Sequence, residues 1–269
     1  MICLRMNNAP IVFVDSGIGG LPYLEWLKNE MPKENFVYLA DSLNFPYGTK
    51  DKKQVINIML NIFNCLKEKY NPKAAVIACN TATVISLETL RKKFSFPIVG
   101  VVPAVKPAAK LSKKKRIGLM ATNITINDKY TEKLIDDFAS NCDVFRYSGT
   151  KIIDFIEKNL FKAETDKKKD VLQPAIDFFR QNDVDTIILG CTHFLLMEDE
   201  LKELLGCDIT VVDSREGVGR QIVRVLEKKD LLSDKKEKED VFILTGEKSD
   251  KNLMESYKWI TEKYGLCEA

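Results

Sequence analysis

The chain alternates short apolar runs with longer segments in which apolar residues recur every three or four positions. Runs of four or five apolar residues predict buried strands, and the longer periodicity predicts amphipathic helices. In the first part of the chain we expect strands at residues 11–14, 36–40, 74–78 and 98–102, and helices at residues 21–31, 53–70 and from residue 81 to about residue 94. Strands that alternate with helices are typical of α/β proteins built on parallel sheets.

A second, similar series follows. It predicts strands at residues 116–120, 142–147, 186–189 and 209–212, and helices at residues 128–140, 152–159 and 171–181. After residue 214, a helix through Leu226, an exposed charged connection at residues 228–240 and a strand at residues 241–244 return to the first half. We therefore expect two α/β domains, residues 1–103 with 214–269 and residues 104–213.

The two halves share a short internal similarity. The segment Ala75–Thr81 and the segment Thr186–His193 are each an apolar strand that ends in a cysteine followed by polar residues. Parallel α/β sheets bind ligands outside the carboxyl ends of their strands. The similarity predicts two pseudo-symmetric domains with mainly parallel sheets and an active-site cleft between them, with Cys79 and Cys191 on opposite walls.

Composition narrows the class of partner. The 269 residues include 41 basic and 39 acidic side chains, a net charge of +2, which gives no electrostatic reason to expect nucleic acid or an anionic membrane. No apolar run approaches the ~20 residues that span a bilayer, and no secretory signal is evident. Seven cysteines without a paired C-x-x-C spacing indicate reduced thiols in the cytoplasm.

Two of these cysteines stand out as candidates for chemistry. Asn80 and Thr81 follow Cys79, and Thr192 and His193 follow Cys191, where a packed core would favour apolar neighbours. His193 is the only histidine, so no tetrahedral zinc set is available and we expect no metal. The other cysteines are interpreted as packing residues: Cys3, Cys65, Cys142, Cys207 and Cys267.

A glycine-rich turn, Asp15–Gly20, follows the first strand. It matches neither common phosphate-binding pattern, and its initial acid would repel phosphate. We interpret it as a tight turn that presents Asp15 and Ser16, with backbone N–H groups available to a ligand carboxylate at a helix N-terminus.

Five segments in order resemble the glutamate racemases, within the wider aspartate/glutamate racemase superfamily. They cover nearly the whole chain: Val14–Leu21, Phe45–Gly48, Ala78–Ala82, Gly100–Pro107 and Leu189–Phe194. Segment Ala121–Thr125 departs from the family, because it lacks a glycine that often precedes the second threonine.

The resemblance implies a cofactor-independent racemase that interconverts L- and D-glutamate, with Cys79 and Cys191 as the proton donor and acceptor. It implies that Asp15 assists Cys79, that His193 assists Cys191, and that an acidic residue lies near the second thiol, for which Asp154 is the candidate. The residues it implies for substrate binding are Asp15, Ser16, Tyr47, Gly48, Asn80, Thr81, Thr125, Thr192 and His193. It further implies a cytoplasmic supply of D-glutamate for peptidoglycan, and a homodimer is compatible with the sequence.

Three alternatives stay open. An aspartate racemase would use the same thiols and differ only in the pocket that measures side-chain length. A cysteine hydrolase would use one thiol as nucleophile with His193 as base, but this leaves the second strand-terminal cysteine without a role. A binding protein without activity would not need both thiols.

Overall fold

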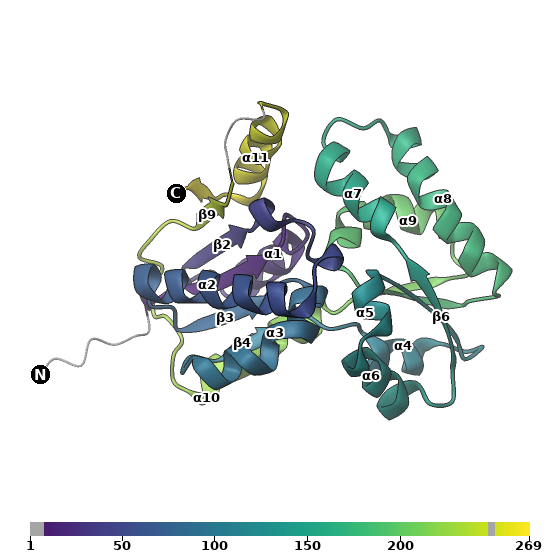
Figure 1. The fold of residues 1–269 in the computed structure, drawn as a ribbon, viewed down its shortest axis with the longest axis horizontal. Coiled ribbons are helices and arrows are strands. Elements are labelled where there is room, and N and C mark those ends of the chain that lie inside the picture. The colour runs from purple at the N-terminus through teal and green to yellow at the C-terminus, as the bar shows by residue number, and fades with distance from the viewer. Residues whose placement is uncertain (1–7, 247–250) are drawn as a thin grey trace, which may run out of the picture. The chain divides into compact units, whose positions relative to one another are not determined.

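The computed structural model describes residues 8–246 and 251–269, which fold into two compact units (Figure 1). Unit 1 comprises Met1–Val101 and Arg215–Ala269, and unit 2 comprises Val102–Ser214. These divisions lie within two residues of the domain boundaries expected from the sequence. Each unit has its own sheet and its own hydrophobic core.

Unit 1 begins with three strand–helix repeats and a fourth strand, and ends with elements from the C-terminal part of the chain. Its strands are β1 (Ile11–Asp15), β2 (Phe36–Ala40), β3 (Ala74–Ile77), β4 (Ile98–Gly100), β9 (Val241–Leu244) and β10 (Cys267–Glu268). Its helices are α1 (Leu21–Glu30), η2 (Ser42–Asn44), η3 (Tyr47–Thr49), α2 (Lys52–Tyr70), α3 (Asn80–Lys93), α10 (Arg215–Lys228) and α11 (Lys251–Tyr264).

Unit 2 follows the same scheme on a smaller sheet. Its strands are β5 (Arg116–Ala121), β6 (Asp143–Ser148), β7 (Thr186–Leu189) and β8 (Thr210–Val212). Its helices are α4 (Val105–Leu111), α5 (Asn123–Asn127), α6 (Lys129–Ala139), α7 (Thr150–Asn159), α8 (Thr165–Gln181), η4 (Thr192–Met197) and α9 (Glu198–Leu205).

Four strands of the unit 1 sheet have the same order and connections as the four strands of the unit 2 sheet. Unit 1 has the strand order β10-β9-β2-β1-β3-β4 and unit 2 the order β6-β5-β7-β8. All the pairings are parallel, so the prediction of an α/β fold with parallel sheets is confirmed. The order β2-β1-β3-β4 matches β6-β5-β7-β8, and the chain crosses from one side of the first strand to the other in each. Cys79 and Cys191 therefore follow equivalent strands, β3 and β7.

Both faces of the unit 1 sheet are covered by helices, which explains why its strands are apolar throughout rather than alternating. On one face, Val12 and Val14 of β1 belong to a buried cluster with Met59 and Phe63 of α2. On the other face, Phe13 lies among residues of α1 and α10: Tyr23, Leu27, Val218 and Ile222. Helix α2 begins with a capping box, in which Gln54 N donates to Asp51 Oδ1 at 2.8 Å and Asp51 N donates to Gln54 Oε1 at 3.1 Å.

Unit 2 packs α8 directly onto its central strand at a glycine. A Cβ atom at Gly118 of β5 would lie 2.6 Å from the ring of Phe179, closer than any side chain tolerates. The absence of a side chain there lets the fully buried Phe179 ring lie against the strand backbone. The opposite face of this sheet packs Leu119 and Ile188 against α4 and α6.

Several elements differ from the expectations. Helix α8 begins at Thr165, six residues before the expected start, so the Lys167–Lys169 run lies within a helix. The short helices α4, α5 and α9 and the final helix α11 were not predicted. Helices α4, α5 and α9 have 7, 5 and 8 residues, and helices this short offer few apolar positions from which a period can be read. This reason does not apply to α11, which has 14 residues.

The packing interpretation was wrong for Cys65, Cys207 and Cys267, whereas Cys142 does pack against the core cluster of unit 2. Cys65, Cys207 and Cys267 are exposed and Cys142 is half-buried. Cys3 lies outside the described residues. The general tendency of cysteine to be buried is overridden by position, since Cys65 lies on the solvent side of α2 and Cys207 follows the end of α9.

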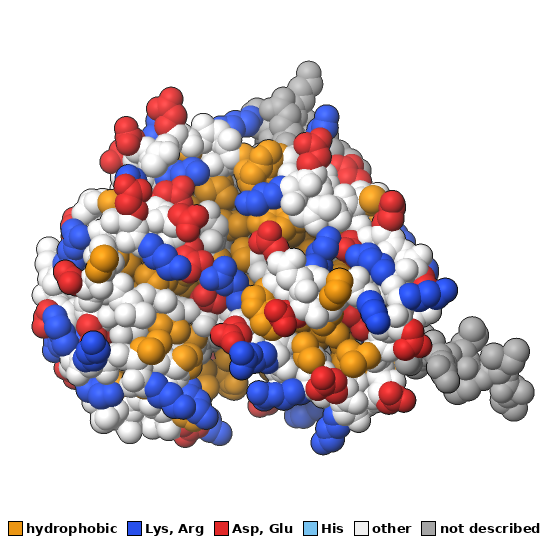
Figure 2. Space-filling model, turned by 180° about the vertical axis from the view of Figure 1, so that it is seen from behind, with side chains coloured by type: hydrophobic (Ala, Val, Ile, Leu, Met, Phe, Trp, Pro, Cys, Tyr) orange, Lys and Arg blue, Asp and Glu red, His pale blue; other side chains and the backbone are white. Residues whose placement is uncertain are grey.

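The surface carries no strong field of one sign on the face drawn in Figure 2, where basic and acidic side chains are interspersed. Among the described residues, no helix combines the length and the apolar character needed to cross a membrane.

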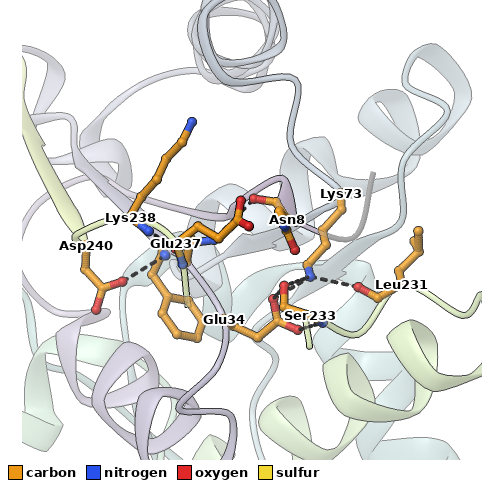
Figure 3. Close-up of polar contacts among 10 residues, drawn as sticks. Asn8, Glu34, Lys73, Leu231, Ser233, Glu237, Lys238 and Asp240 are labelled. Atoms are coloured by element: carbon orange, nitrogen blue, oxygen red, sulfur yellow. Dashed lines mark hydrogen bonds and ion pairs between the residues drawn. The ribbon is translucent and has the colours of Figure 1, made fainter. Parts of the chain in front are cut away.

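The connection at residues 228–240 was expected to be an exposed loop, but two buried anchors attach it to the amino ends of the strands (Figure 3). At the first anchor, Lys73 forms an ion pair with Glu34, and its Nζ donates to Leu231 O at 2.7 Å and to Ser233 Oγ at 2.9 Å. Ser233 Oγ in turn donates to Glu34 Oε2 at 2.9 Å. Burial lowers the pKa of Lys73, and Glu34 opposes that effect.

The second anchor aligns β9 beside β2. Lys238 N donates to Asn35 Oδ1 at 2.8 Å, and Phe36 N donates to Asp240 Oδ1 at 3.0 Å (Figure 3). Strand β9 starts at the next residue and pairs with β2 from Val37 onward. The anchors thus fix where the returning chain joins the sheet.

We predict that Glu34→Gln and Lys73→Met each lower the free energy of unfolding by about 3–5 kcal/mol, because each leaves a buried charge without its partner. The double variant Glu34→Gln/Lys73→Met should lose much less than the sum of the two, since it buries no unpaired charge. Urea unfolding of the full chain measures all three. Arg220→Gln removes an exposed ion pair with Glu216 in the same unit and should leave the unfolding free energy nearly unchanged. Additive losses in the double variant would contradict the ion-pair explanation.

Candidate active site

In unit 1, the site residues gather where two neighbouring strands end. Strands β1 and β3 pair in parallel, so Asp15 at the end of β1 and Cys79 just after β3 lie close together at the carboxyl ends of the strands. Ser16 lies between them: its Oγ donates to Asp15 Oδ1 at 3.2 Å and lies 3.9 Å from Cys79 Sγ. Asp15, Ser16 and Cys79 are all buried, with exposed fractions of 0%, 4% and 7%. The structure therefore joins three of the predicted site residues in one contact chain.

Asn80 is the group in this unit that most clearly lacks a protein partner. It begins α3 directly after Cys79 and is 2% exposed, yet neither its Nδ2 nor its Oδ1 hydrogen-bonds within the part of the chain that the structure describes. A buried amide without partners costs free energy, so such a group indicates a site that a polar ligand completes. Thr81, the next residue, is also buried.

The segment after β2, which lies at the same carboxyl ends of the strands, carries Tyr47 and Gly48. Tyr47 Oη donates to Asp41 Oδ2 at 2.6 Å, and Asp41 also accepts from Thr245 Oγ1 at 2.6 Å. Burial, followed by the charge of Asp41, raises the pKa of Tyr47 far above its usual range, so its hydroxyl remains protonated. Asp41 was not among the predicted site residues, although its position just after β2 places it at these strand ends. It fixes the loop that carries Tyr47.

In unit 2, Cys191 belongs to a buried row of three titratable side chains. Cys191 Sγ lies 3.8 Å from His193 Nδ1, and His193 Nε2 lies 2.9 Å from Glu157 Oε2. Their exposed fractions are 6%, 2% and 8%. Burial alone would lower the pKa of His193, but its hydrogen bonds to Cys191 and Glu157 outweigh burial and raise the pKa well above the usual value.

This arrangement can hold or move a proton at the thiol. A protonated imidazole beside Cys191 stabilises a thiolate, whereas a neutral imidazole with its proton on Nε2 can accept the thiol proton at Nδ1. Glu157 favours both states, because it accepts the Nε2 proton and offsets a positive charge on the ring.

Glu157, rather than the expected Asp154, is the acidic residue against His193. Asp154 is half-buried and takes no part in these contacts. The helical period could have predicted that Glu157 is buried, because Glu157 lies four residues after Ile153 and next to Ile156, on the buried face of α7. A glutamate on an apolar helix face requires a partner, and His193 supplies it.

In unit 2 the neighbouring strand, β5, is followed by two threonines, one that caps α5 and one within that helix. Thr122 caps α5 by accepting from Thr125 N at 3.2 Å, and its hydroxyl donates to Thr125 Oγ1 at 3.0 Å. Thr125 is fully buried, and Thr192 is 1% exposed beside Cys191. Because β5 pairs with β7, these residues lie at the same end of the unit 2 sheet as the thiol.

Each unit thus places one thiol at the carboxyl end of the equivalent strand, next to the point where the strand order reverses, which is where α/β sheets bind ligands. Over residues 8–246 and 251–269, no three cysteine, histidine or acidic side chains gather in a way that could hold a metal ion.

The family model described as Asp/Glu/Hydantoin racemase matches residues 24–216. The chain belongs to this racemase family. Within it, the chain is 38% identical to the glutamate racemase of Shewanella sp. (strain MR-7) over 81% of the chain and 80% of that protein. It is 35% identical to the glutamate racemase of Clostridium botulinum over 94% of the chain and 98% of that protein.

Solved structures of glutamate racemases share the fold. The Escherichia coli enzyme, in complex with L-glutamate and the activator UDP-MurNAc-Ala, has a TM-score of 0.84 at 32% identity, covering 97% of each chain. An isoform from Bacillus anthracis has a TM-score of 0.83 at 28% identity, covering 98% of this chain and 97% of that chain. The chain is therefore an enzyme of the racemase family, grouped with the glutamate racemases.

We predict that His193 titrates above its unperturbed pKa of about 6.5 and that Glu157→Gln lowers this pKa by removing the carboxylate. As the only histidine, His193 gives one ring resonance to follow by NMR against pH. The pair stabilises the fold of this racemase fully below about pH 6.5, and this contribution is lost as the pH rises through the raised pKa.

Glu200→Gln provides the control, because Glu200 pairs with Lys168 in the same unit, away from the thiol. It should leave the His193 titration unchanged. A His193 pKa at or below the unperturbed value in the parent chain would contradict the proposed charge coupling.

Proposed function

We propose that this chain interconverts L- and D-glutamate without a cofactor by a two-base mechanism in which Cys79 and Cys191 exchange a proton with Cα. The observation that carries the proposal is that equivalent strands of two equivalent sheets each end in a buried thiol with a polar partner. The names of the relatives support glutamate as the substrate.

The reaction removes the Cα proton from one face of the amino acid and delivers a proton to the other. One thiol begins as thiolate and takes the proton, while the other begins protonated and gives its own. The two exchange roles for the opposite enantiomer, so they titrate as a coupled pair. The mechanism requires both thiols to reach one Cα when substrate is bound.

Each thiol has a partner that can manage its proton. His193, supported by Glu157, can hold the proton of Cys191 or stabilise its thiolate. In unit 1 the partner set is Ser16 and Asp15, linked by their hydrogen bond. The different partner sets give each thiol its own proton acceptor in the two directions of reaction.

The carbanion formed at Cα needs stabilisation without an electron sink, so hydrogen-bond donors around the α-carboxylate must supply it. Asn80 suits this task, because its amide can donate to the carboxylate through Nδ2 and accept from the ammonium through Oδ1. The N-terminus of α3 adds backbone N–H groups that favour a carboxylate. Tyr47, Gly48, Thr81, Thr125 and Thr192 complete the proposed substrate-binding set.

We further propose that the D-glutamate is made in the cytoplasm for peptidoglycan. The support is the resemblance to glutamate racemases. Complementation of a bacterium that requires added D-glutamate tests this role, and growth without the supplement is the expected outcome.

We predict that Cys79→Ala and Cys191→Ala each reduce racemisation by at least roughly 10²- to 10⁴-fold, the usual contribution of a positioned acid or base. Chiral chromatography of L- and D-glutamate measures the rate in both directions. Cys65→Ala in unit 1 and Cys207→Ala in unit 2 remove exposed thiols and should leave the rate unchanged. Substantial two-way activity in either active-site variant would refute the two-thiol mechanism.

The same assay with L-aspartate separates the substrate from the mechanism. Faster turnover of aspartate, abolished by both cysteine variants, would make the substrate assignment wrong and leave the two-thiol chemistry in place. Acylation of a thiol by an ester, with no racemisation of either amino acid, would favour a hydrolase instead.

A further inference from the structure

Tyr38 lies at the centre of β2 and is completely buried, with its ring stacked on the ring of Phe242 at 5.8 Å. Its hydroxyl does not take part in strand pairing. It reaches the turn between β1 and α1, where it donates to Gly17 O at 2.9 Å and accepts from Gly20 N at 3.1 Å. A single hydroxyl therefore bridges both ends of the segment Gly17–Gly20.

The turn is packed tightly onto this hydroxyl. A Cβ atom at Gly20 would lie 2.9 Å from Tyr38 Oη, 2.9 Å from Asp15 Oδ2 and 2.5 Å from Ala78 Cβ. Glycine is required here because the backbone itself contacts the tyrosine, the Asp15 carboxylate and the residue before Cys79. The Tyr38 hydroxyl and the Asp15 carboxylate thus border the same small space.

The conformation of this turn determines where Asp15 and Ser16 point. Gly17 N donates to Asp15 Oδ1 at 3.3 Å, and Ser16 bridges the same oxygen to Cys79 Sγ. The contacts therefore run from Tyr38 through the turn backbone to Asp15, Ser16 and the thiol.

We infer that Tyr38 is a positioning residue for the Cys79 half of the reaction: its hydroxyl holds the turn in the conformation that keeps Asp15 and Ser16 against the thiol. It does not touch the substrate and acts through the turn. This inference rests on the proposed function, because the role of Asp15 and Ser16 toward Cys79 belongs to that proposal.

The test is Tyr38→Phe, which keeps the stacked ring and removes only the hydroxyl. We expect kcat to fall by roughly 10- to 100-fold, since a misplacement of about 1 Å can cost about 100-fold, while KM changes less. A second readout does not depend on turnover. Iodoacetamide should alkylate Cys79 faster relative to Cys191 in the variant, because Ser16 no longer shields the thiol. Mass spectrometry of the two cysteine peptides gives the ratio.

Ser233→Ala is the matched control. It removes another buried hydroxyl of unit 1, at the anchor with Glu34 and Lys73 at the opposite end of the sheet. It should destabilise the fold and leave both kcat and the alkylation ratio as in the parent chain.

An unchanged kcat and an unchanged alkylation ratio in Tyr38→Phe would overturn the inference. So would an equal acceleration at both cysteines, or the same effects in Ser233→Ala, because each would indicate general loosening. Retained activity in Cys79→Ala would instead overturn the proposed function, and the alkylation ratio would still report whether Tyr38 holds the turn.

Discussion

In a parallel sheet that is covered by helices on both faces, polar side chains that bind ligands or react lie at the ends of the strands. In unit 1 every residue of β1, β2 and β3 is buried, so a polar group within a strand loses its water and must reach a protein partner. Tyr38 of β2 does so because its hydroxyl extends to the turn that follows β1. At the carboxyl ends the backbone turns toward helices and polar groups can meet one another. The strand pairing then decides which ones are neighbours: Asp15 and Cys79 follow paired strands in unit 1, and Thr122 and Cys191 follow paired strands in unit 2.

The position of the site at the carboxyl ends of the strands could be predicted, because the sequence pattern indicates where each strand ends. An apolar run that stops at cysteine and continues with polar residues marks both the element and its functional end. The fold class followed from such local signals, whereas the pairing of His193 with Cys191 was implied by the family resemblance, and the contact of Ser16 with Cys79 was not predicted. The relation between β3 and β7 was also readable, since the similarity between them lies within a single strand and turn.

The sequence did not predict hydrogen-bond and ion-pair partners that are distant along the chain. Glu157 lies 34 positions before Cys191 on a helix, and its role depends on the helix face that meets η4. Asp41 resembles any polar residue of a loop until Thr245, from the returning strand, donates to it. Lys73 and Ser233 are separated by more than half the chain. Local patterns predict elements and their ends, whereas long-range pairing of buried polar groups depends on packing that no local pattern specifies.

The division of unit 1 along the chain has a consequence for how the protein is synthesised. Its first 101 residues leave the ribosome well before Arg215–Ala269, and Val102–Ser214 emerges in between. Until β9 arrives, the edge of β2 has unpaired backbone groups, and exposed edges invite pairing with other chains. The nascent protein therefore passes through a period in which unit 2 has all its strands and the β2 edge of unit 1 is still unpaired.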